Sequence, residues 1–238
     1  MSRLIAWMDR TFYPDFQSNW DDVHFRARIL SYMRPEFHVL DIGAGAGIVE
    51  QMHFKGHVAQ VCGVDLDPRV NDNPFLDEGR VANADSIPYE NNRFDLIFAN
   101  NVMEHLADPE AVFSEIERVL RPGGTVLFKT PNRSHYMPII ARMTPHWFHQ
   151  DYNRLRGRET EDTFPTHYLA NSKQQVEKLA SKSGLEPVSI DRIEGRPEYL
   201  RLVVLTYAAG LLYERIVNAL PFLARYRILL IAVLRKPA

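Results

Sequence analysis

One short stretch, FHVLDIGAGAG at residues 37–47, constrains this chain more than any other. Its apolar first half predicts a buried strand, and its second half places glycines at alternate positions, Gly43, Gly45 and Gly47. Residues 48–54 are then expected to be helical. A strand, a glycine-rich turn and a helix N-terminus form a cradle in which the backbone approaches a nucleotide-like ligand closely. The alternative is a tight connection that binds nothing, because a glycine motif alone is weakly specific.

The glycine spacing argues against a nicotinamide dinucleotide. That fingerprint, Gly-x-Gly-x-x-Gly, requires its third glycine at position 48 when counted from Gly43, or at position 50 when counted from Gly45. Those positions hold Ile48 and Glu50. An oxidoreductase of the nicotinamide class is therefore disfavoured.

Composition predicts one soluble α/β domain with room for a cap or an insertion. The chain has 238 residues, with 28 basic and 30 acidic side chains and a net charge of −2, so a general nucleic-acid binder is not expected. The single cysteine, Cys62, excludes an intrachain disulfide and a cysteine-based zinc site. A reducing compartment, the cytoplasm, is the expected location. The N-terminal apolar stretch is broken by Asp9 and is too short for a signal peptide.

Acidic residues follow the next two predicted strands. A strand over 59–64 ends at Asp65, followed by Leu66, and an acid at this tip can accept hydrogen bonds from both hydroxyls of a ribose. A third strand is predicted over 80–84, followed by Asp85 and Ser86. Asp65 and Asp85 are also typical of ordinary turns, so each could have a purely structural role instead of a ligand-binding one.

The fourth predicted strand, 93–101, brings polar groups to the same edge of the sheet. Ligands of doubly wound sheets bind outside the carboxyl ends of the strands. Asn100, Asn101, Glu104 and His105 are therefore expected at the mouth of a site. His105 has two open interpretations, a general base or a side chain that only packs and hydrogen-bonds beside a cofactor.

Three motifs together resemble the class I S-adenosylmethionine-dependent methyltransferases, in particular their small-molecule members. They are Asp41-x-Gly-x-Gly-x-Gly, the run NNVMEHL at 100–106, and a helix over 108–120 that ends in Arg-Pro-Gly-Gly before a fifth strand at 125–130. The resemblance covers residues 37–131 continuously. It implies a seven-stranded, mostly parallel, doubly wound Rossmann-like sheet with an antiparallel last strand and helices on both faces.

The resemblance also implies a cofactor, S-adenosylmethionine, and its product S-adenosylhomocysteine. The glycine loop is expected along the methionine part, Asp65 at the ribose, and Asp85 and Ser86 at the adenine. The full set of expected cofactor-binding residues is Asp41, Gly43, Ala44, Gly45, Gly47, Asp65, Leu66, Asp85, Ser86, Asn100, Asn101 and His105.

Residues 132–168 form an insertion after the fifth strand, interpreted as a lid over the substrate. It supplies two further candidate bases, His167 and Tyr136. Three arginines, Arg154, Arg156 and Arg158, suit either an anionic group or a solvated loop. His146 and His149 lack an acid or cysteine partner at metal-ligand spacing, so no metal is expected.

The remaining segments complete a single domain over 1–238. Residues 1–35 form an N-terminal cap with a helix near 21–32, residues 36–131 the cofactor core, and residues 169–238 the end of the sheet. That last part contains a helix over 172–183, strands over 186–194 and 227–234, and an apolar helix within 199–222. The apolar segment has four open interpretations: burial, peripheral membrane contact, closure over a hydrophobic substrate, or a homodimer contact.

The resemblance predicts an enzyme that methylates an oxygen or nitrogen of a small, apolar or amphipathic acceptor. Natural products, lipids or quinones, and glycoconjugate precursors are the acceptor classes it suggests. A non-catalytic partner subunit that only binds the cofactor is the alternative. The intact Asp41, Asp65 and glycines count against it.

Overall fold

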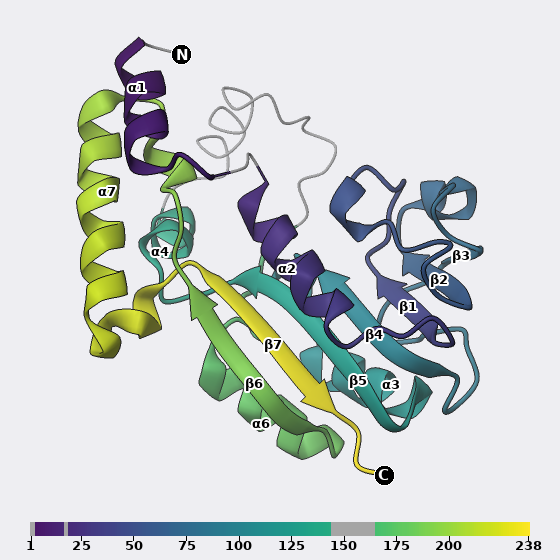
Figure 1. Cartoon of the computed structure of the whole chain (residues 1–238). Helices are drawn as coiled ribbons and strands as arrows, with labels where there is room; N and C mark the ends of the chain where they lie inside the picture. The colour runs from purple at the N-terminus through teal and green to yellow at the C-terminus, as the bar shows by residue number, and fades with distance from the viewer. Residues whose placement is uncertain (1–2, 17–18, 144–164) are drawn as a thin grey trace. The chain divides into compact units, whose positions relative to one another are not determined.

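The computed structural model describes residues 3–16, 19–143 and 165–238 (Figure 1). Its backbone contacts divide the chain into two compact units. We call them the sheet unit, which comprises Asp22–Pro131, Pro165–Asp191 and Leu230–Ala238, and the helical unit, which comprises Met1–Asp21, Asn132–Phe164 and Arg192–Leu229.

Seven strands form one sheet in the order β3-β2-β1-β4-β5-β7-β6. The strands β1 to β5 pair in parallel, and the last strand, β7, runs antiparallel to its neighbours (Figure 1). The doubly wound, mostly parallel sheet expected from the sequence is thus confirmed. The strand bounds are β1 (His38–Ile42), β2 (Gln60–Asp65), β3 (Glu78–Val81), β4 (Phe94–Asn100), β5 (Leu120–Pro131), β6 (Glu186–Ile193) and β7 (Leu229–Arg235).

Helices cover both faces of the sheet within the sheet unit. In Figure 1, α2 (Trp20–Leu30) crosses in front of the strands, while α3 (Pro109–Val119) and α6 (Lys173–Ser183) lie behind them. The central strands β1 and β4 are mostly apolar because both of their faces are buried. Phe113 of α3 and Val176 of α6 join strand side chains such as Phe128 in one continuous core.

The ends of α3 and α6 follow the capping residues visible in the sequence. Asp108 Oδ1 accepts the Ala111 N–H at 3.1 Å, and Pro109 occupies the first turn of α3. Ser172 Oγ accepts the Gln175 N–H at 3.3 Å, and Gly184 ends α6 with a φ of +82°.

The expected helix over 48–54 is wrong. Only a three-residue 3-10 turn, η1 (Glu50–Met52), forms there. The Arg26 guanidinium donates hydrogen bonds to the carbonyl oxygens of Gln51 and His53, at 2.7 and 3.0 Å. These carbonyls are therefore paired with a side chain of α2 instead of with the backbone N–H groups of a helix. Phe54 is fully buried against Phe98, which fixes the end of the segment.

The third strand begins earlier than expected and is shorter, covering Glu78–Val81 instead of 80–84. Gly79 permits this because Val70 O lies 1.9 Å from where a Cβ would be, a space that no other residue type could occupy. Strand pairing ends where the Ala82 N–H donates to Asp65 O, at the edge that carries the polar residues.

The helical unit contains α1 (Arg3–Phe12), α4 (Tyr136–Met143), α7 (Val204–Ala219) and the 3-10 helices η5 (Glu198–Leu200) and η6 (Pro221–Tyr226). The sequence did not predict α1, which packs through Ile5 and Met8 against Tyr207 of α7. Among the described residues, no helix combines the length and apolar character needed to cross a membrane.

Candidate functional site

The glycine loop after β1 has a backbone that favours glycine at three positions. Gly43, Gly45 and Gly47 have φ values of +81°, +48° and +74°, in the left-handed region where a Cβ is strained. The Gly43 N–H donates to Val64 O at 2.8 Å, which ties the start of the loop to β2. A Cβ on Gly43 would lie 2.3 Å from Val102 Cγ2, whereas one on Gly45 would meet only Asp65 Oδ2, at 3.7 Å. The loop is therefore packed on one side and open at Gly45.

Asp65, at the tip of β2, holds this loop. Its Oδ2 accepts the Gly45 N–H at 2.7 Å, and its Oδ1 accepts the Asp67 N–H at 2.8 Å. A carboxylate has about four lone-pair sites, so these two bonds leave acceptor capacity for a ligand's hydroxyls. The sequence-predicted acid and glycines thus lie in direct contact.

Asp41 lies beneath the loop as a buried acid. Its side chain belongs to the central strand β1, between Gly63 of β2 and Phe98 of β4. Burial raises the pKa of Asp41 well above its usual range, and the nearby Asp65 carboxylate adds to this effect.

Three residues that sequence reasoning missed fix the outer side of the loop. Asn73 Nδ2 donates to the carbonyls of Ala44 and Gly45, both at 3.1 Å. His53 Nε2 lies 2.8 Å from Gly47 O, and its ring stacks on Phe75 with 3.3 Å between centroids. The sequence offered one signal for this contact, Asn73 before a proline, and that pattern is equally typical of an ordinary turn.

The two expected adenine-side residues follow β3 on an exposed turn. The Asn83 amide donates to Asp85 Oδ2 at 2.9 Å, and the Ser86 N–H donates to Asn83 O. Leu66, after β2, leaves 59% of its surface exposed. These three side chains are thus available to a ligand, and their roles stay predictions.

At the end of β4, the polar residues meet two partners that the sequence did not reveal. Asn100 Nδ2 and Lys129 Nζ both donate to Asp22 Oδ1, at 3.0 and 2.5 Å. Lys129 belongs to β5 and is fully buried, so Asp22 of α2 neutralises an interior charge. Asn100 Oδ1 is buried and has no hydrogen-bond partner among the described residues. Asn101 follows with a φ of +56°, which turns the chain away from the strand.

A buried relay fixes the next turn, η3 (Met103–His105). Asn171 Nδ2 donates to Thr130 Oγ1 at 2.6 Å, and the Thr130 hydroxyl donates to Glu104 Oε2 at 2.7 Å. Burial raises the pKa of Glu104, and the hydrogen bond from Thr130 partly opposes that shift. The three side chains connect the end of β4, the end of β5 and the start of α6.

This turn brings two of the three candidate bases into one neighbourhood. The backbone N–H of His167 donates to the carbonyl oxygen of Glu104 at 2.7 Å, and Glu104 directly precedes His105. The His105 ring holds Nδ1 2.9 Å from Pro165 O. His167 is exposed and His105 is partly exposed.

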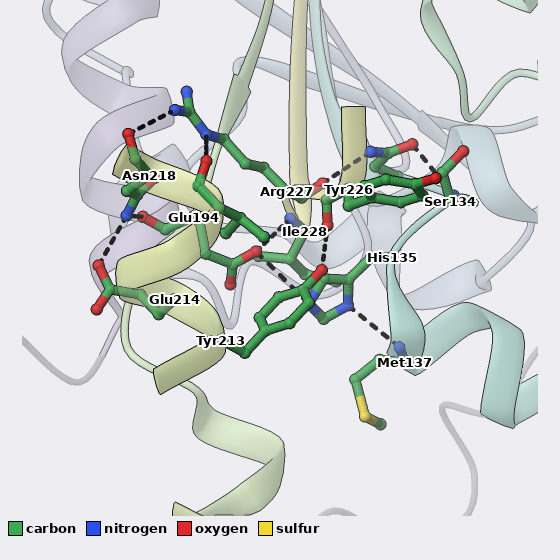
Figure 2. Close-up of polar contacts among 12 residues, drawn as sticks. Ser134, His135, Met137, Glu194, Tyr213, Glu214, Asn218, Tyr226, Arg227 and Ile228 are labelled. Carbon is green, nitrogen blue, oxygen red and sulfur yellow. Dashed lines mark hydrogen bonds and ion pairs between the residues drawn. The ribbon is translucent and has the colours of Figure 1, made fainter. Parts of the chain in front are cut away.

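The third candidate base, Tyr136, lies in the helical unit. Its ring is 3.9 Å from the His135 ring and 4.9 Å from the Tyr213 ring, centroid to centroid. Figure 2 shows His135 and Tyr213 beside Glu194 in this interior cluster. His135 Nε2 is 3.5 Å from Glu194 Oε2, and the Tyr213 hydroxyl donates to Tyr226 O. Tyr136 thus has a packing role that needs no substrate.

Most of the predicted lid lies outside the described residues: His146, Trp147, Phe148, His149, Tyr152, Arg154, Arg156 and Arg158. In the ranges 3–16, 19–143 and 165–238, no group of three or more His, Cys, Asp or Glu side chains is placed to hold a metal ion.

Comparison with known proteins identifies the family. A family model described as a methyltransferase domain matches residues 17–190, more than half of the chain. The chain belongs to the class I S-adenosylmethionine-dependent methyltransferases.

Named relatives of this methyltransferase differ in the atom they modify. It is 32% identical over 185 residues to the ubiquinone/menaquinone biosynthesis C-methyltransferase UbiE of Burkholderia vietnamiensis, covering 68% of this chain and 73% of that one. It is 35% identical over 100 residues to the malonyl-[acyl-carrier protein] O-methyltransferase of Hahella chejuensis, covering 39% of this chain. That match spans only 36% of the Hahella protein's length.

The fold of the methyltransferase matches solved structures as well. Phosphoethanolamine N-methyltransferase 2 of Haemonchus contortus, in complex with S-adenosyl-L-methionine, superposes with a TM-score of 0.58. The sequence identity is 20%, and the match covers 100% of this chain and 61% of that chain. At this identity the likeness establishes the fold alone.

Proposed function

We propose that this chain binds S-adenosylmethionine at the glycine loop and transfers its methyl group to an oxygen or nitrogen of a small acceptor. The observation that carries the proposal is the hydrogen bond from Gly45 to Asp65, which joins three left-handed glycines to an acid at the tip of β2. The open side of the loop at Gly45 fits a ligand that lies against the backbone.

Each residue of the site has a proposed task. The glycine loop receives the methionine part, and the free lone pairs of Asp65 accept the ribose hydroxyls. Asp85 and Ser86 flank the adenine, with Leu66 beside it. Asn100 and Asn101 border the methionine end.

When bound, S-adenosylmethionine supplies an electrophilic methyl group on a sulfonium. The protein's part is to align the acceptor and, where the acceptor atom carries a proton, to accept that proton. His105 and His167 are the proposed groups. The backbone N–H of His167 donates to the carbonyl of Glu104, the residue before His105, so the two histidines lie close together, and an imidazole exchanges protons near neutral pH. The relay Asn171–Thr130–Glu104 keeps the turn that carries His105 in place.

The proposed acceptor is apolar or amphipathic: a natural product, a lipid or quinone, or a glycoconjugate precursor. Relatives named for quinone and acyl-carrier-protein methylation support this class without choosing a member. We also propose that the apolar segment 199–222 contacts either a membrane surface or a second copy of the chain.

Calorimetric titration with S-adenosylhomocysteine, with NADH as the matched control, tests the cofactor part. Binding of the first ligand alone is expected, because Ile48 and the missing helix after the loop deny a pyrophosphate its usual site. Preferential binding of NADH would contradict the proposal.

An activity assay tests whether the chain transfers the methyl group. The chain is mixed with labelled S-adenosylmethionine and a panel of amphipathic phenols, amines and acids, and transfer of label is followed by mass spectrometry. Transfer to any member supports an enzyme. Tight cofactor binding with no transfer across the panel would favour the alternative, a cofactor-binding partner subunit.

A further inference from the structure

The outward face of α7 is apolar along its whole length. Leu205, Leu212 and Ile216 are 79%, 62% and 41% exposed. Their spacing of seven and four residues puts them on one side of the helix, together with the exposed alanines 208, 209 and 219. The opposite side, which includes Tyr207 and Val217, is buried.

Flanking elements of the helical unit continue this character. Phe222 in η6 is 70% exposed, and Leu202 and Val203, directly before α7, are 50% and 56% exposed. On α1, Leu4 and Trp7 are 50% and 49% exposed. So much exposed apolar surface on a few adjoining segments is typical of a docking site.

The charges on α1, α7 and η6 are sorted by sign. Their only two carboxylates point inward: Asp9 accepts hydrogen bonds from Arg201 and Tyr207, and Glu214 from Tyr13 and Asn218. The exposed charged side chains of these three elements are all arginines: Arg3, Arg10, Arg215 and Arg225. Of these, Arg215 pairs with Glu214, with Nε 3.3 Å from Oε2.

This sorting distinguishes two occupants. In a symmetric dimer the same surface faces itself, so Arg3, Arg10 and Arg225 would meet a surface on which these elements expose no carboxylate. An anionic lipid surface instead offers hydrocarbon to the leucines and phosphate to the arginines. A tryptophan beside arginines also suits the boundary between headgroups and acyl chains.

We propose that the outward face of α7, with Phe222 and the arginines of α1 and η6, is a docking surface for an anionic lipid membrane. Binding is peripheral, because α7 has 16 residues, a length of about 24 Å, and lies flat on the surface. The proposal concerns the helical unit alone and does not depend on methyl transfer.

Vesicle co-sedimentation of the full chain tests the proposal. Vesicles of phosphatidylcholine alone are compared with vesicles that also contain phosphatidylglycerol, at low and high salt. The chain is expected to partition into the anionic vesicles, more weakly into the neutral ones, and less as salt rises.

Two variants separate the contributions of apolar and charged groups. Leu205→Ser with Leu212→Ser is expected to weaken partitioning into both kinds of vesicle by more than about tenfold, since both leucines lose apolar burial. Arg3→Gln with Arg10→Gln and Arg225→Gln is expected to weaken binding to anionic vesicles by about fivefold for each arginine and to remove the salt dependence.

Val188→Ser is the matched control, because Val188 is 46% exposed on β6, away from these elements in the sequence. It should partition as the unchanged chain does. Circular dichroism confirms that each variant folds. Equal partitioning of the double leucine variant and the unchanged chain would overturn the proposal. The proposal would also be overturned if the unchanged chain did not bind anionic vesicles but formed a dimer in sedimentation equilibrium, and if the two leucine substitutions abolished that dimer.

Discussion

Asp65 has both a structural and a proposed binding task. It orders the glycine loop through Gly45 and, in our proposal, accepts the ribose hydroxyls. Asp65→Ala should weaken S-adenosylhomocysteine binding by roughly 1–3 kcal/mol, the cost of leaving polar partners unpaired. Isothermal calorimetry measures the change, and unchanged affinity would refute the ribose assignment.

Asp65→Asn is the informative companion. Its amide oxygen can still accept the Gly45 N–H, while the negative charge and much of the acceptor capacity are lost. If Asp65 only orders the loop, the asparagine variant should bind nearly as the unchanged chain does. An affinity between those of the alanine variant and the unchanged chain would support both tasks.

Glu194 makes the stability of the chain depend on pH. Burial raises its pKa from 4.5 to about 8, and the hydrogen bond from the Ile228 N–H opposes that shift (Figure 2). An acid with a raised pKa in the folded state stabilises the fold fully below its unfolded value and loses that contribution as pH rises through the folded value. The contribution of Glu194 to the free energy of unfolding should therefore fall by a few kcal/mol between pH 4.5 and 8.

Glu194→Gln isolates this contribution, because glutamine stays neutral and can still accept the Ile228 N–H. Urea unfolding at several pH values should show the loss in the unchanged chain but not in the variant. Burial also lowers the pKa of the neighbouring His135 from 6.5 to about 3, so His135 destabilises the fold as pH falls below 6.5 and opposes the Glu194 effect between pH 4.5 and 6.5. The net loss in the unchanged chain is therefore expected chiefly between pH 6.5 and 8. Parallel profiles of the two proteins between pH 6.5 and 8 would contradict the prediction.

The contacts of a residue were predictable where one short motif contained both partners. Asp65 and the three glycines were found because strand, turn and acid follow one another within thirty residues or so. Asp22 and Lys129 were missed, because they meet Asn100 only after three distant segments have packed. Asn73 was missed for a similar reason, since its target carbonyls lie almost thirty residues away.

At the scale of elements, the turn after β4 depends on Thr130 of β5. Thr130→Val keeps the shape but removes the hydroxyl that joins Glu104 to Asn171. We expect the free energy of unfolding to fall by about 1–3 kcal/mol, since both partners stay buried. Denaturant unfolding measures this. Thr130→Ser keeps the hydroxyl and should lose no more than about 1 kcal/mol, the value of one methyl group; a larger loss than in the valine variant would contradict the role of the hydroxyl.

The helix α6 offers a local prediction. Ser172→Ala removes the acceptor for the Gln175 N–H and should cost about 1 kcal/mol of stability, measured by thermal or urea unfolding. Ser172→Asp, which can also cap the helix, should be close to neutral. Equal losses in both variants would show that the cap does not stabilise α6.

Element boundaries were predictable where local capping decides them, as at Asp108 and Gly184. The segment 48–54 was not, because Arg26 takes the Gln51 and His53 carbonyls from another part of the chain. The helix α1 was missed because the aromatic residues around it obscured its short apolar face, Ile5 and Met8.

At the scale of the molecule, ligand binding should appear as stability. A ligand that binds only the folded state at a hundred times its dissociation constant adds about 2.7 kcal/mol. S-adenosylhomocysteine should therefore raise the unfolding midpoint of the unchanged chain, and NADH should not. Asp65→Ala should show a smaller shift at the same ligand concentration, and an equal shift would place the ligand elsewhere.

The position of β7 has a consequence for synthesis on the ribosome. Of the seven strands of this sheet β7 is made last, yet it lies between β5 and β6. At a translation speed of about 5–20 residues per second, β6 therefore emerges some seconds before its neighbour exists. During that interval β5 and β6 each expose an unpaired edge, while β1 to β4 can already pair. The nascent chain thus completes the half that holds the glycine loop first, and is most exposed to chaperones and to misassociation just before β7 is added.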